Sequence, residues 1–155
     1  MMTLCCKVLE ALKGKTLATA ESITGGGIGA ALTAVPGSSA VFLGGIISYT
    51  NEVKHRQLGV SREALDAFGA VSAPVAEAMA KGVRQNLGAD FGLSVTGLAG
   101  PSGDEFGNPL GTVYIGCSRE GKTLSRKYHF SGTRAEIRQA TIRAALEQLL
   151  SWLEE

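Results

Sequence analysis

Apolar side chains recur along this chain with helical spacing in some stretches and as short continuous runs in others. Leu4, Val8 and Leu12 share one face of a helix, which predicts an opening helix that ends near Gly14. The remaining helices are expected at 24–35, 51–58, 61–68, 72–87 and 133–153. The strands are expected at 16–20, 45–50, 91–96, 113–117 and 124–130.

The order of these elements predicts the fold class. Helices and strands alternate at first, and two strands then follow each other directly, with Glu120-Gly121 as the turn between them. Thr133 and Glu136 form a capping box that begins the last helix. We therefore expect residues 1–155 to form a single α/β domain, a three-layer sandwich in which helices flank a mixed β-sheet.

Three polar segments follow directly on predicted strands. They are Glu21-Ser22, Tyr49-Thr50-Asn51 and Thr96-Gly97. Because sites in open α/β sheets lie beyond the carboxyl ends of the strands, these segments are the first candidates for a site.

A long uncharged stretch, 22–51, contains no Asp, Glu, Lys, Arg or His. A membrane-spanning helix needs about 20 predominantly apolar residues. This stretch instead holds seven glycines and is interrupted by Pro36 in a turn-like Pro-Gly-Ser-Ser segment. The pattern is typical of a segment buried in a folded protein, and we expect no membrane association.

Composition and charge narrow the class further. Apolar residues make up 45% and charged residues 19% of the chain, which is typical of a globular protein. The net charge is +1, with basic and acidic residues interspersed, so no nucleic-acid partner is expected. The three cysteines (Cys5, Cys6 and Cys117) lack paired spacing, which favours reduced thiols and a cytoplasmic location.

The glycine run after Ser22 is open to several interpretations. Gly25, Gly27 and Ala30 satisfy a dinucleotide-binding G-x-G-x-x-A pattern. The end of the next strand (48–50) is uncharged, however, and offers no carboxylate to hold a ribose, so a dehydrogenase is disfavoured. Backbone amides at a helix start can bind a phosphate or support an oxyanion. Close packing of the helix on the sheet explains the glycines equally well.

Serine and lysine residues offer a second chemistry. Ser22, Ser38 and Ser39 lie on glycine-rich turns, and Lys54 is the first cation after the uncharged stretch. A lysine beside apolar walls loses solvation, its pKa falls, and its neutral amine can deprotonate a serine. An ordinary solvated helix position explains Lys54 as well.

Other chemistries find less support. His55 and His129 are the only histidines, far apart and outside any G-x-S-x-G elbow, so neither a Ser-His-Asp triad nor a zinc site is expected. Arg134 and Arg138 share one face of the last helix, where either one can reach an anionic group.

Five sequence blocks together carry a family resemblance: TAESITGG, PGSSAVFLGGIISYTNEVK, GAVSAPVAEAMA, VTGLAGPSG and NPLGTVYIG. In this order they resemble the C-terminal domain family of the competence/damage-inducible protein CinA, which includes stand-alone nicotinamide-nucleotide amidases. The resemblance implies hydrolysis of nicotinamide mononucleotide (NMN) to nicotinic acid mononucleotide and ammonia, without a metal or redox cofactor. It also implies a homo-oligomer.

The resemblance assigns the chemistry to a serine–lysine pair. Lys54 matches the lysine, Ser39 is the favoured nucleophile, and Ser22 is the second choice. Tyr49 and Thr96 fall at further active-site positions of the family. Substrate-binding roles are expected for five more residues: Thr24, Gly25, Gly26, Gly97 and Arg138.

Several points stay open at this level. A nucleotide-binding regulatory module without turnover is the alternative function. Glu21 can orient Lys54, bind ribose hydroxyls or cap a backbone amide. The glycine-rich loop at 98–111 either closes over the substrate or only connects two strands.

Overall fold

The computed structural model describes all residues 1–155 and contains one five-stranded sheet with the order β2-β1-β3-β4-β5. Strands β1, β2 and β3 are mutually parallel, while β4 runs antiparallel to β3 and β5 antiparallel to β4. The expected mixed sheet is therefore confirmed. The strand bounds are β1 Leu17–Glu21, β2 Phe42–Ile47, β3 Phe91–Gly97, β4 Thr112–Arg119 and β5 Lys122–His129.

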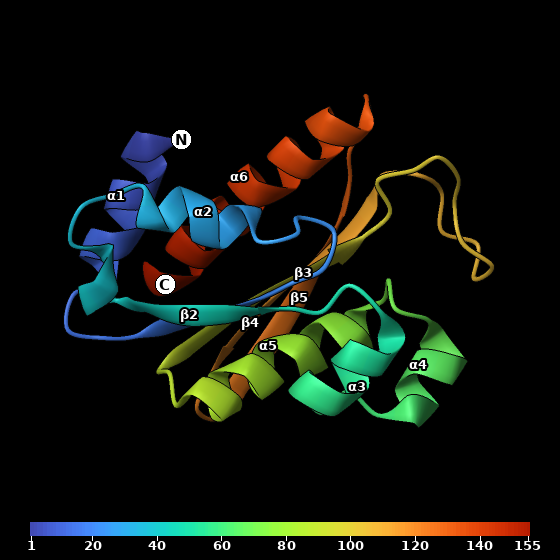
Figure 1. The fold of residues 1–155 in the computed structure, drawn as a ribbon, viewed down its shortest axis with the longest axis horizontal. Coiled ribbons are helices and arrows are strands. Elements are labelled where there is room, and N and C mark those ends of the chain that lie inside the picture. The colour runs from blue at the N-terminus through green and yellow to red at the C-terminus, as the bar shows by residue number, and fades with distance from the viewer.

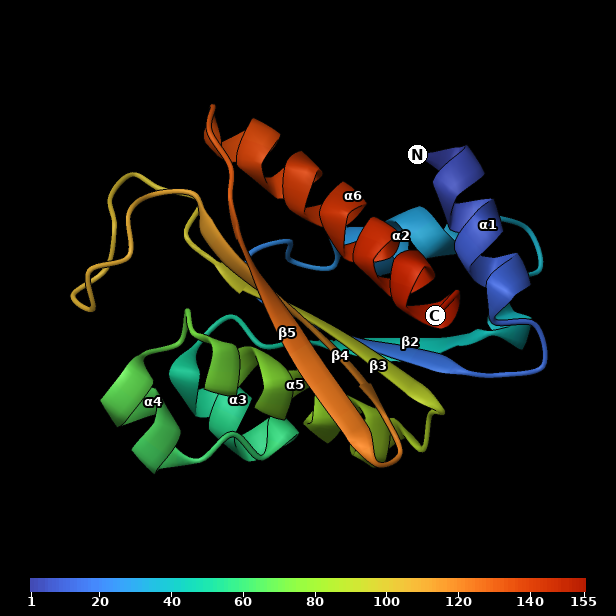
Figure 2. The same cartoon turned by 180° about the vertical axis from the view of Figure 1, so that it is seen from behind.

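Helices cover both faces of this sheet, as Figures 1 and 2 show from opposite sides. One layer holds α1 and α2 with the long α6, and the other holds α3, α4 and α5. The helix bounds are α1 Met2–Ala11, α2 Gly27–Thr33, α3 Asn51–Leu58, α4 Arg62–Phe68, α5 Ala73–Leu87 and α6 Arg134–Leu153, with a short 3-10 helix η1 at Ser38–Ala40. The expected three-layer α/β sandwich is confirmed.

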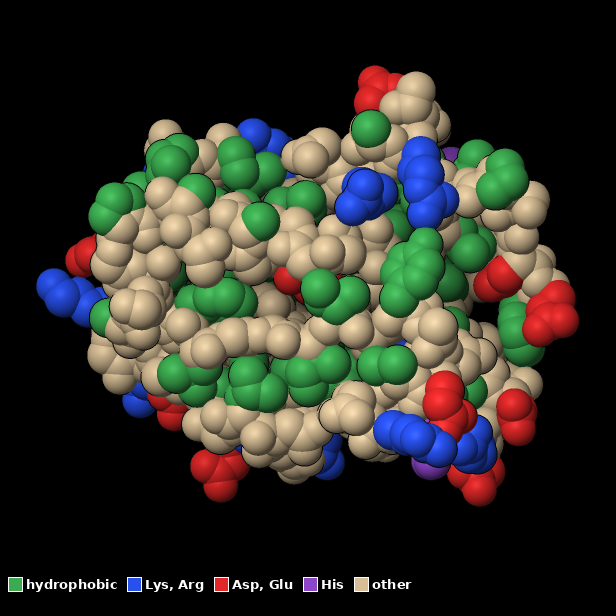
Figure 3. Space-filling model, viewed as in Figure 1, with side chains coloured by type: hydrophobic (Ala, Val, Ile, Leu, Met, Phe, Trp, Pro, Cys, Tyr) green, Lys and Arg blue, Asp and Glu red, His purple; other side chains and the backbone are tan.

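The two edges of the sheet differ in their charge. β5 carries Lys122, Arg126 and Lys127, all exposed, which is a common protection of an edge strand. β2 carries no charged side chain and exposes Leu43 and Ile47. Figure 3 shows the face with β2 in front, where hydrophobic side chains are scattered across the middle beside one small acidic patch, and most charged side chains lie toward the rim.

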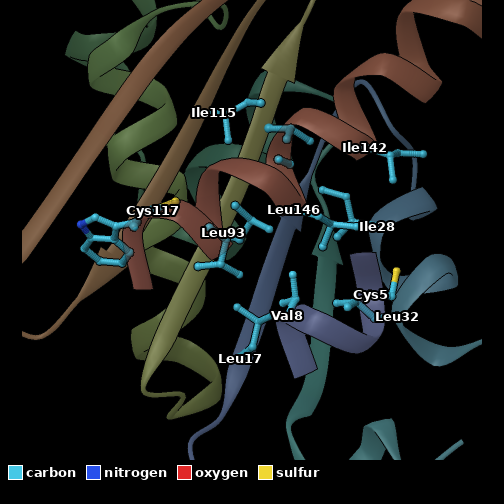
Figure 4. Close-up of a cluster of buried hydrophobic side chains, with 14 of the residues drawn as sticks. Cys5, Val8, Leu17, Ile28, Leu32, Leu93, Ile115, Cys117, Ile142 and Leu146 are labelled. Atoms are coloured by element: carbon cyan, nitrogen blue, oxygen red, sulfur yellow. The ribbon is translucent and has the colours of Figure 1, made fainter. Parts of the chain in front are cut away.

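The larger hydrophobic core lies between the sheet and the layer of α1, α2 and α6. Figure 4 shows its centre, in which Leu17 and Leu93 of the sheet meet Val8 of α1, Ile28 of α2 and Leu146 of α6. These side chains are fully buried. A smaller core on the opposite face packs α5 against β1.

None of the six helices has the length and apolar character of a membrane span. The three cysteines are free.

Most predicted elements are present, but the second strand was misplaced. It was expected at 45–50, whereas β2 spans Phe42–Ile47. Tyr49 and Thr50 suit a strand by propensity, yet Thr50 instead caps α3. The strand begins earlier than expected because Phe42 and Gly44 pair with Leu17 and Ala18 of β1. Tertiary packing thus overrides the propensities of single residues.

Candidate active site

Lys54 is the most buried charged side chain of the site, with 2% of its surface exposed. It lies in the second turn of α3, and its ammonium donates to the Ser48 carbonyl oxygen at 2.7 Å and to the Ser22 Oγ at 3.1 Å. No carboxylate forms a salt bridge with it. Desolvation by burial lowers the pKa of Lys54 from 10.5 to about 8. A lysine in this state is ready to act as a base near neutral pH.

Ser22 follows β1 directly and is 7% exposed. Its backbone N–H donates to the Val95 carbonyl oxygen of the neighbouring strand β3, and its own carbonyl accepts from the Gly25 N–H. These bonds extend the sheet by one residue and then turn the chain. The hydroxyl is thereby held beside Lys54, which arrives from the carboxyl end of β2. The two side chains meet because β1 and β2 are parallel and end at the same edge of the sheet.

A cavity of about 270 Å³ opens beside this pair. Thr96 and Gly97 at the end of β3 line it, together with Tyr49, Ser22 and Lys54. Thr96 is 1% exposed, and its hydroxyl donates to the Ala70 carbonyl oxygen at 2.8 Å. All three predicted polar segments therefore lie around a single cavity.

Arg134 also lines the cavity, although the sequence had given no reason to prefer it to Arg138. It is the first residue of α6, and its guanidinium donates to the Tyr49 hydroxyl and to the Gly100 carbonyl oxygen, both at 2.9 Å. Tyr49 is 60% exposed, so this side of the cavity is open to solvent. The signal in the sequence was the capping box, which places Arg134 at a helix start.

Arg138 lies one turn further along α6, and its guanidinium donates to backbone carbonyl oxygens. Its Nε donates to the Ile23 carbonyl oxygen at 3.1 Å and its Nη2 to the Thr24 carbonyl oxygen at 3.2 Å. Gly25, whose φ is +58°, leaves room for this guanidinium. Arg138 therefore braces the turn that carries Ser22, and it does not line the cavity.

Glu21 binds the backbone amides at the glycine-rich start of α2. Its buried carboxylate accepts from the Thr24 hydroxyl at 2.6 Å and from the backbone N–H groups of Ile28 and Gly29 at 2.8 and 3.0 Å. These amides belong to the first turn of α2, so a carboxylate of the chain already occupies the place where a phosphate would bind. The expectation of a phosphate there is corrected.

The turn before α2 contains one backbone amide without an acceptor in the chain, although none of its glycines lines the cavity. The N–H groups of Gly25 and Gly27 donate to the carbonyl oxygens of Ser22 and Thr24. Gly26 has a φ of +99° and its N–H donates to no atom of the chain. Gly26 is therefore the candidate donor among the three glycines.

The pairing of Ser39 with Lys54 within one chain does not form. Ser39 lies in η1, before β2, whereas Lys54 lies beyond the opposite end of that strand. Six residues of extended strand, Phe42–Ile47, separate the two ends, which corresponds to about 20 Å. The hydroxyl beside Lys54 belongs to Ser22, the second choice. The expected strand at 45–50 already separated Ser39 from Lys54, but that Ser22 lies beside Lys54 follows only from the parallel pairing of β1 with β2.

The glycine-rich loop between β3 and β4 is fastened to the body of the protein. The Asp104 carboxylate accepts from the N–H groups of Phe106 and Asn108, and the Asn108 side chain donates to the Val71 carbonyl oxygen at 3.0 Å. A Cβ on Gly69 would collide with the Phe106 ring. The loop thus packs on the segment between α4 and α5, beside the cavity.

Fold and site together describe an α/β domain with a buried serine–lysine pair at the carboxyl edge of its parallel strands. The chain belongs to the CinA C-terminal domain family, whose model matches residues 2–153. It is 49% identical over 139 residues to a CinA-like protein of Gemmatimonas aurantiaca and 50% identical over 139 residues to one of Acaryochloris marina, covering 90% and 88% of this chain. It spans about a third of the length of these relatives, 32% and 33%.

Solved structures of the family share the whole fold. The competence damage-inducible protein A (ComA) of Klebsiella pneumoniae superposes with a TM-score of 0.96 at 35% identity, covering 99% of this chain and 97% of that one. The competence/damage inducible protein CihA of Agrobacterium tumefaciens gives 0.93 at 40% identity, covering 99% and 95%. No cluster of three metal-ligating side chains forms in this chain.

Proposed function

We propose that this domain hydrolyses the carboxamide of nicotinamide mononucleotide, with Ser22 as nucleophile and Lys54 as general base. The observation that carries the proposal is the distance of 3.1 Å between the Lys54 Nζ and the Ser22 Oγ, in a buried environment that lowers the pKa of the lysine. The carbonyl oxygen of Ser48 fixes the amine on its other side. This arrangement is the general form of a base-activated nucleophile.

The reaction proceeds in two steps, acylation of Ser22 and hydrolysis of the acyl-enzyme. Neutral Lys54 accepts the Ser22 hydroxyl proton as the oxygen attacks the amide carbon, and we assign stabilisation of the resulting oxyanion to the Gly26 N–H. Lys54 then delivers the proton to the departing nitrogen, which leaves as ammonia, and the acyl-enzyme remains. Water attacks this ester while Lys54 accepts one of its protons, and Lys54 returns that proton to the Ser22 Oγ as the ester bond breaks. Free Ser22 and neutral Lys54 are regenerated, and the carboxylic acid leaves and ionises in solvent.

Other residues of the cavity suit the pyridinium ring and the 5′-phosphate of the nucleotide. Tyr49 presents an exposed ring to the cavity, on which a cationic pyridinium can stack. Arg134 carries a guanidinium at the mouth and lies at the N-terminus of α6, so charge and helix dipole both favour an anion there. We assign the 5′-phosphate to Arg134 and give Arg138 the role of bracing the Ser22 turn.

The test is ammonia release from nicotinamide mononucleotide by the wild-type domain, Ser22→Ala and Lys54→Ala. We expect release by the wild type and a loss of at least about a thousandfold in each variant, since residues that act as a unit show nearly the full effect singly. Nucleotide binding without ammonia release by the wild type would contradict the proposal and support a regulatory module. Full activity of Ser22→Ala would contradict the assignment of the nucleophile.

A further inference from the structure

Two polar side chains, Asn51 and Ser102, line the active-site cavity without a hydrogen-bond partner in the chain. The other polar side chains of the cavity are already engaged: Ser22 with Lys54, Tyr49 with Arg134, and Thr96 with a backbone carbonyl oxygen. Both Asn51 and Ser102 are exposed. Cavities that bind small molecules use a few polar groups to orient the ligand, and these two side chains are free to do so.

The fold places these two side chains at different parts of the cavity. Asn51 is the first residue of α3, and residues three apart on a helix share a face, so Asn51 lies beside Lys54. Ser102 belongs to the loop between β3 and β4, in which the Gly100 carbonyl oxygen accepts from Arg134. Asn51 is therefore at the catalytic end of the cavity, whereas Ser102 is at the end that we assign to the phosphate.

The carboxamide nitrogen of the substrate has to lie on the Lys54 side of the cavity, because Lys54 delivers the proton with which ammonia departs. A carboxamide NH2 group donates two hydrogen bonds and needs acceptors where protein encloses it. The Ser48 carbonyl oxygen is already bound to Lys54. The side-chain oxygen Oδ1 of Asn51 is the free acceptor on this side of the cavity.

We propose that Asn51 makes the site specific for an amide, because its Oδ1 accepts a hydrogen bond from the carboxamide NH2 group of the substrate. This contact holds the leaving nitrogen beside Lys54. In the acid product a carboxylate oxygen takes the place of the NH2 group, so two acceptor oxygens face each other and the product binds more weakly. The role of Asn51 rests on the proposed amidase function, since it concerns the group that the reaction removes.

The contact is measured as binding to the Ser22→Ala protein, in which the nucleotide stays intact. Isothermal titration calorimetry gives the dissociation constants of nicotinamide mononucleotide and of nicotinic acid mononucleotide. Addition of Asn51→Leu, which has a similar volume and no hydrogen-bonding group, should weaken binding of the amide about tenfold and change binding of the acid less than about twofold. Lys54 is present in both proteins, so its attraction for the carboxylate cancels in the comparison.

A conservative variant separates recognition from a structural role. Asn51→Asp keeps an acceptor oxygen, so KM for nicotinamide mononucleotide should stay within about threefold of the wild type, whereas Asn51→Leu should raise it about tenfold. Inhibition by the acid product should weaken at least about tenfold in Asn51→Asp, because two carboxylates then face each other. Gln57→Leu replaces an exposed amide on the same helix outside the cavity, and it should change both constants by less than about twofold.

Equal losses for the amide and the acid in Asn51→Leu, or unchanged binding of both, would overturn the role of Asn51. An Asn51→Asp protein that loses the amide as strongly as Asn51→Leu would overturn it as well. If the wild type releases no ammonia, the amidase proposal fails, while the dissociation constants measured with Ser22→Ala still decide whether Asn51 recognises the amide. If ammonia is released and Asn51→Leu keeps the wild-type ratio of the two affinities, only the role of Asn51 fails.

Discussion

Replacing Lys54 by methionine should abolish activity and at the same time stabilise the fold at neutral pH. A buried amine whose pKa is about 8, against 10.5 for an exposed lysine, costs the folded state about 3 kcal/mol while it is protonated. Methionine has a similar length and no charge, so it removes this cost. The Ser48 carbonyl and the Ser22 hydroxyl lose their donor, which offsets about 1–2 kcal/mol.

The net gain at pH 7 is therefore about 1–2 kcal/mol, or about 3–6 °C in Tm for a chain of this size. Its pH dependence identifies the cause. The folded state holds Lys54 with the lower pKa, so between about pH 8 and 10.5 it binds fewer protons than the unfolded state, and the wild type gains stability as the pH rises. The advantage of Lys54→Met should be full below about pH 7. It should have disappeared or slightly reversed by pH 10, where the remaining charge penalty of about 1 kcal/mol no longer exceeds the loss of the hydrogen bonds.

The assay is thermal and urea unfolding of both proteins at pH 7 and pH 10. Other groups that titrate in this range are common to both proteins and cancel in the difference. Lys13→Met, at an exposed lysine, is the control and should change the stability by less than about 0.5 kcal/mol. An equal stability difference at pH 7 and pH 10, or a Lys54→Met protein less stable than the wild type at pH 7, would refute the reasoning.

Three further outcomes follow from the site. The kcat/KM for nicotinamide mononucleotide should rise with pH and level off above about 8, because only neutral Lys54 accepts the proton; a pH profile that is flat from 6 to 9 would contradict this. Arg134→Ala should raise KM for the nucleotide at least about tenfold and leave the phosphate-free riboside within about twofold; equal losses for both substrates would exclude a phosphate contact. Glu21→Gln should destabilise the fold by about 2 kcal/mol in urea unfolding, because an amide NH2 then faces the Ile28 or Gly29 N–H; unchanged stability would contradict the capping role.

The local elements of the fold could be predicted from short-range signals. The capping box of Thr133 and Glu136 is formed as expected, and the turn at Glu120-Gly121 joins β4 to β5. Such signals work because the groups that satisfy each other lie within four residues. The expected bounds of β2 were wrong because this strand is defined by contacts with residues that are distant in sequence. Phe42 and Gly44 belong to the strand because they pair with Leu17 and Ala18 of the neighbouring strand β1, which no local pattern records.

The site was predicted as a set of residues but not as a geometry. Lys54, Ser22, Tyr49 and Thr96 line one cavity because parallel strands end at one edge. The choice between Ser22 and Ser39 required the parallel pairing of β1 with β2, which brings the end of β1 and Ser22 to the same edge of the sheet as Lys54.

The sequence by itself determined the fold class, the polar strand ends and the uncharged stretch around the site, since these depend on periodicity and residue type. The tertiary structure alone decided which serine lies beside Lys54, that Glu21 fills the start of α2, and that Arg134 lies at the cavity while Arg138 supports the turn. It also decided the chemistry of the lysine. The pKa of Lys54 falls because layers distant in sequence exclude water from it, and burial is a property of the assembled fold.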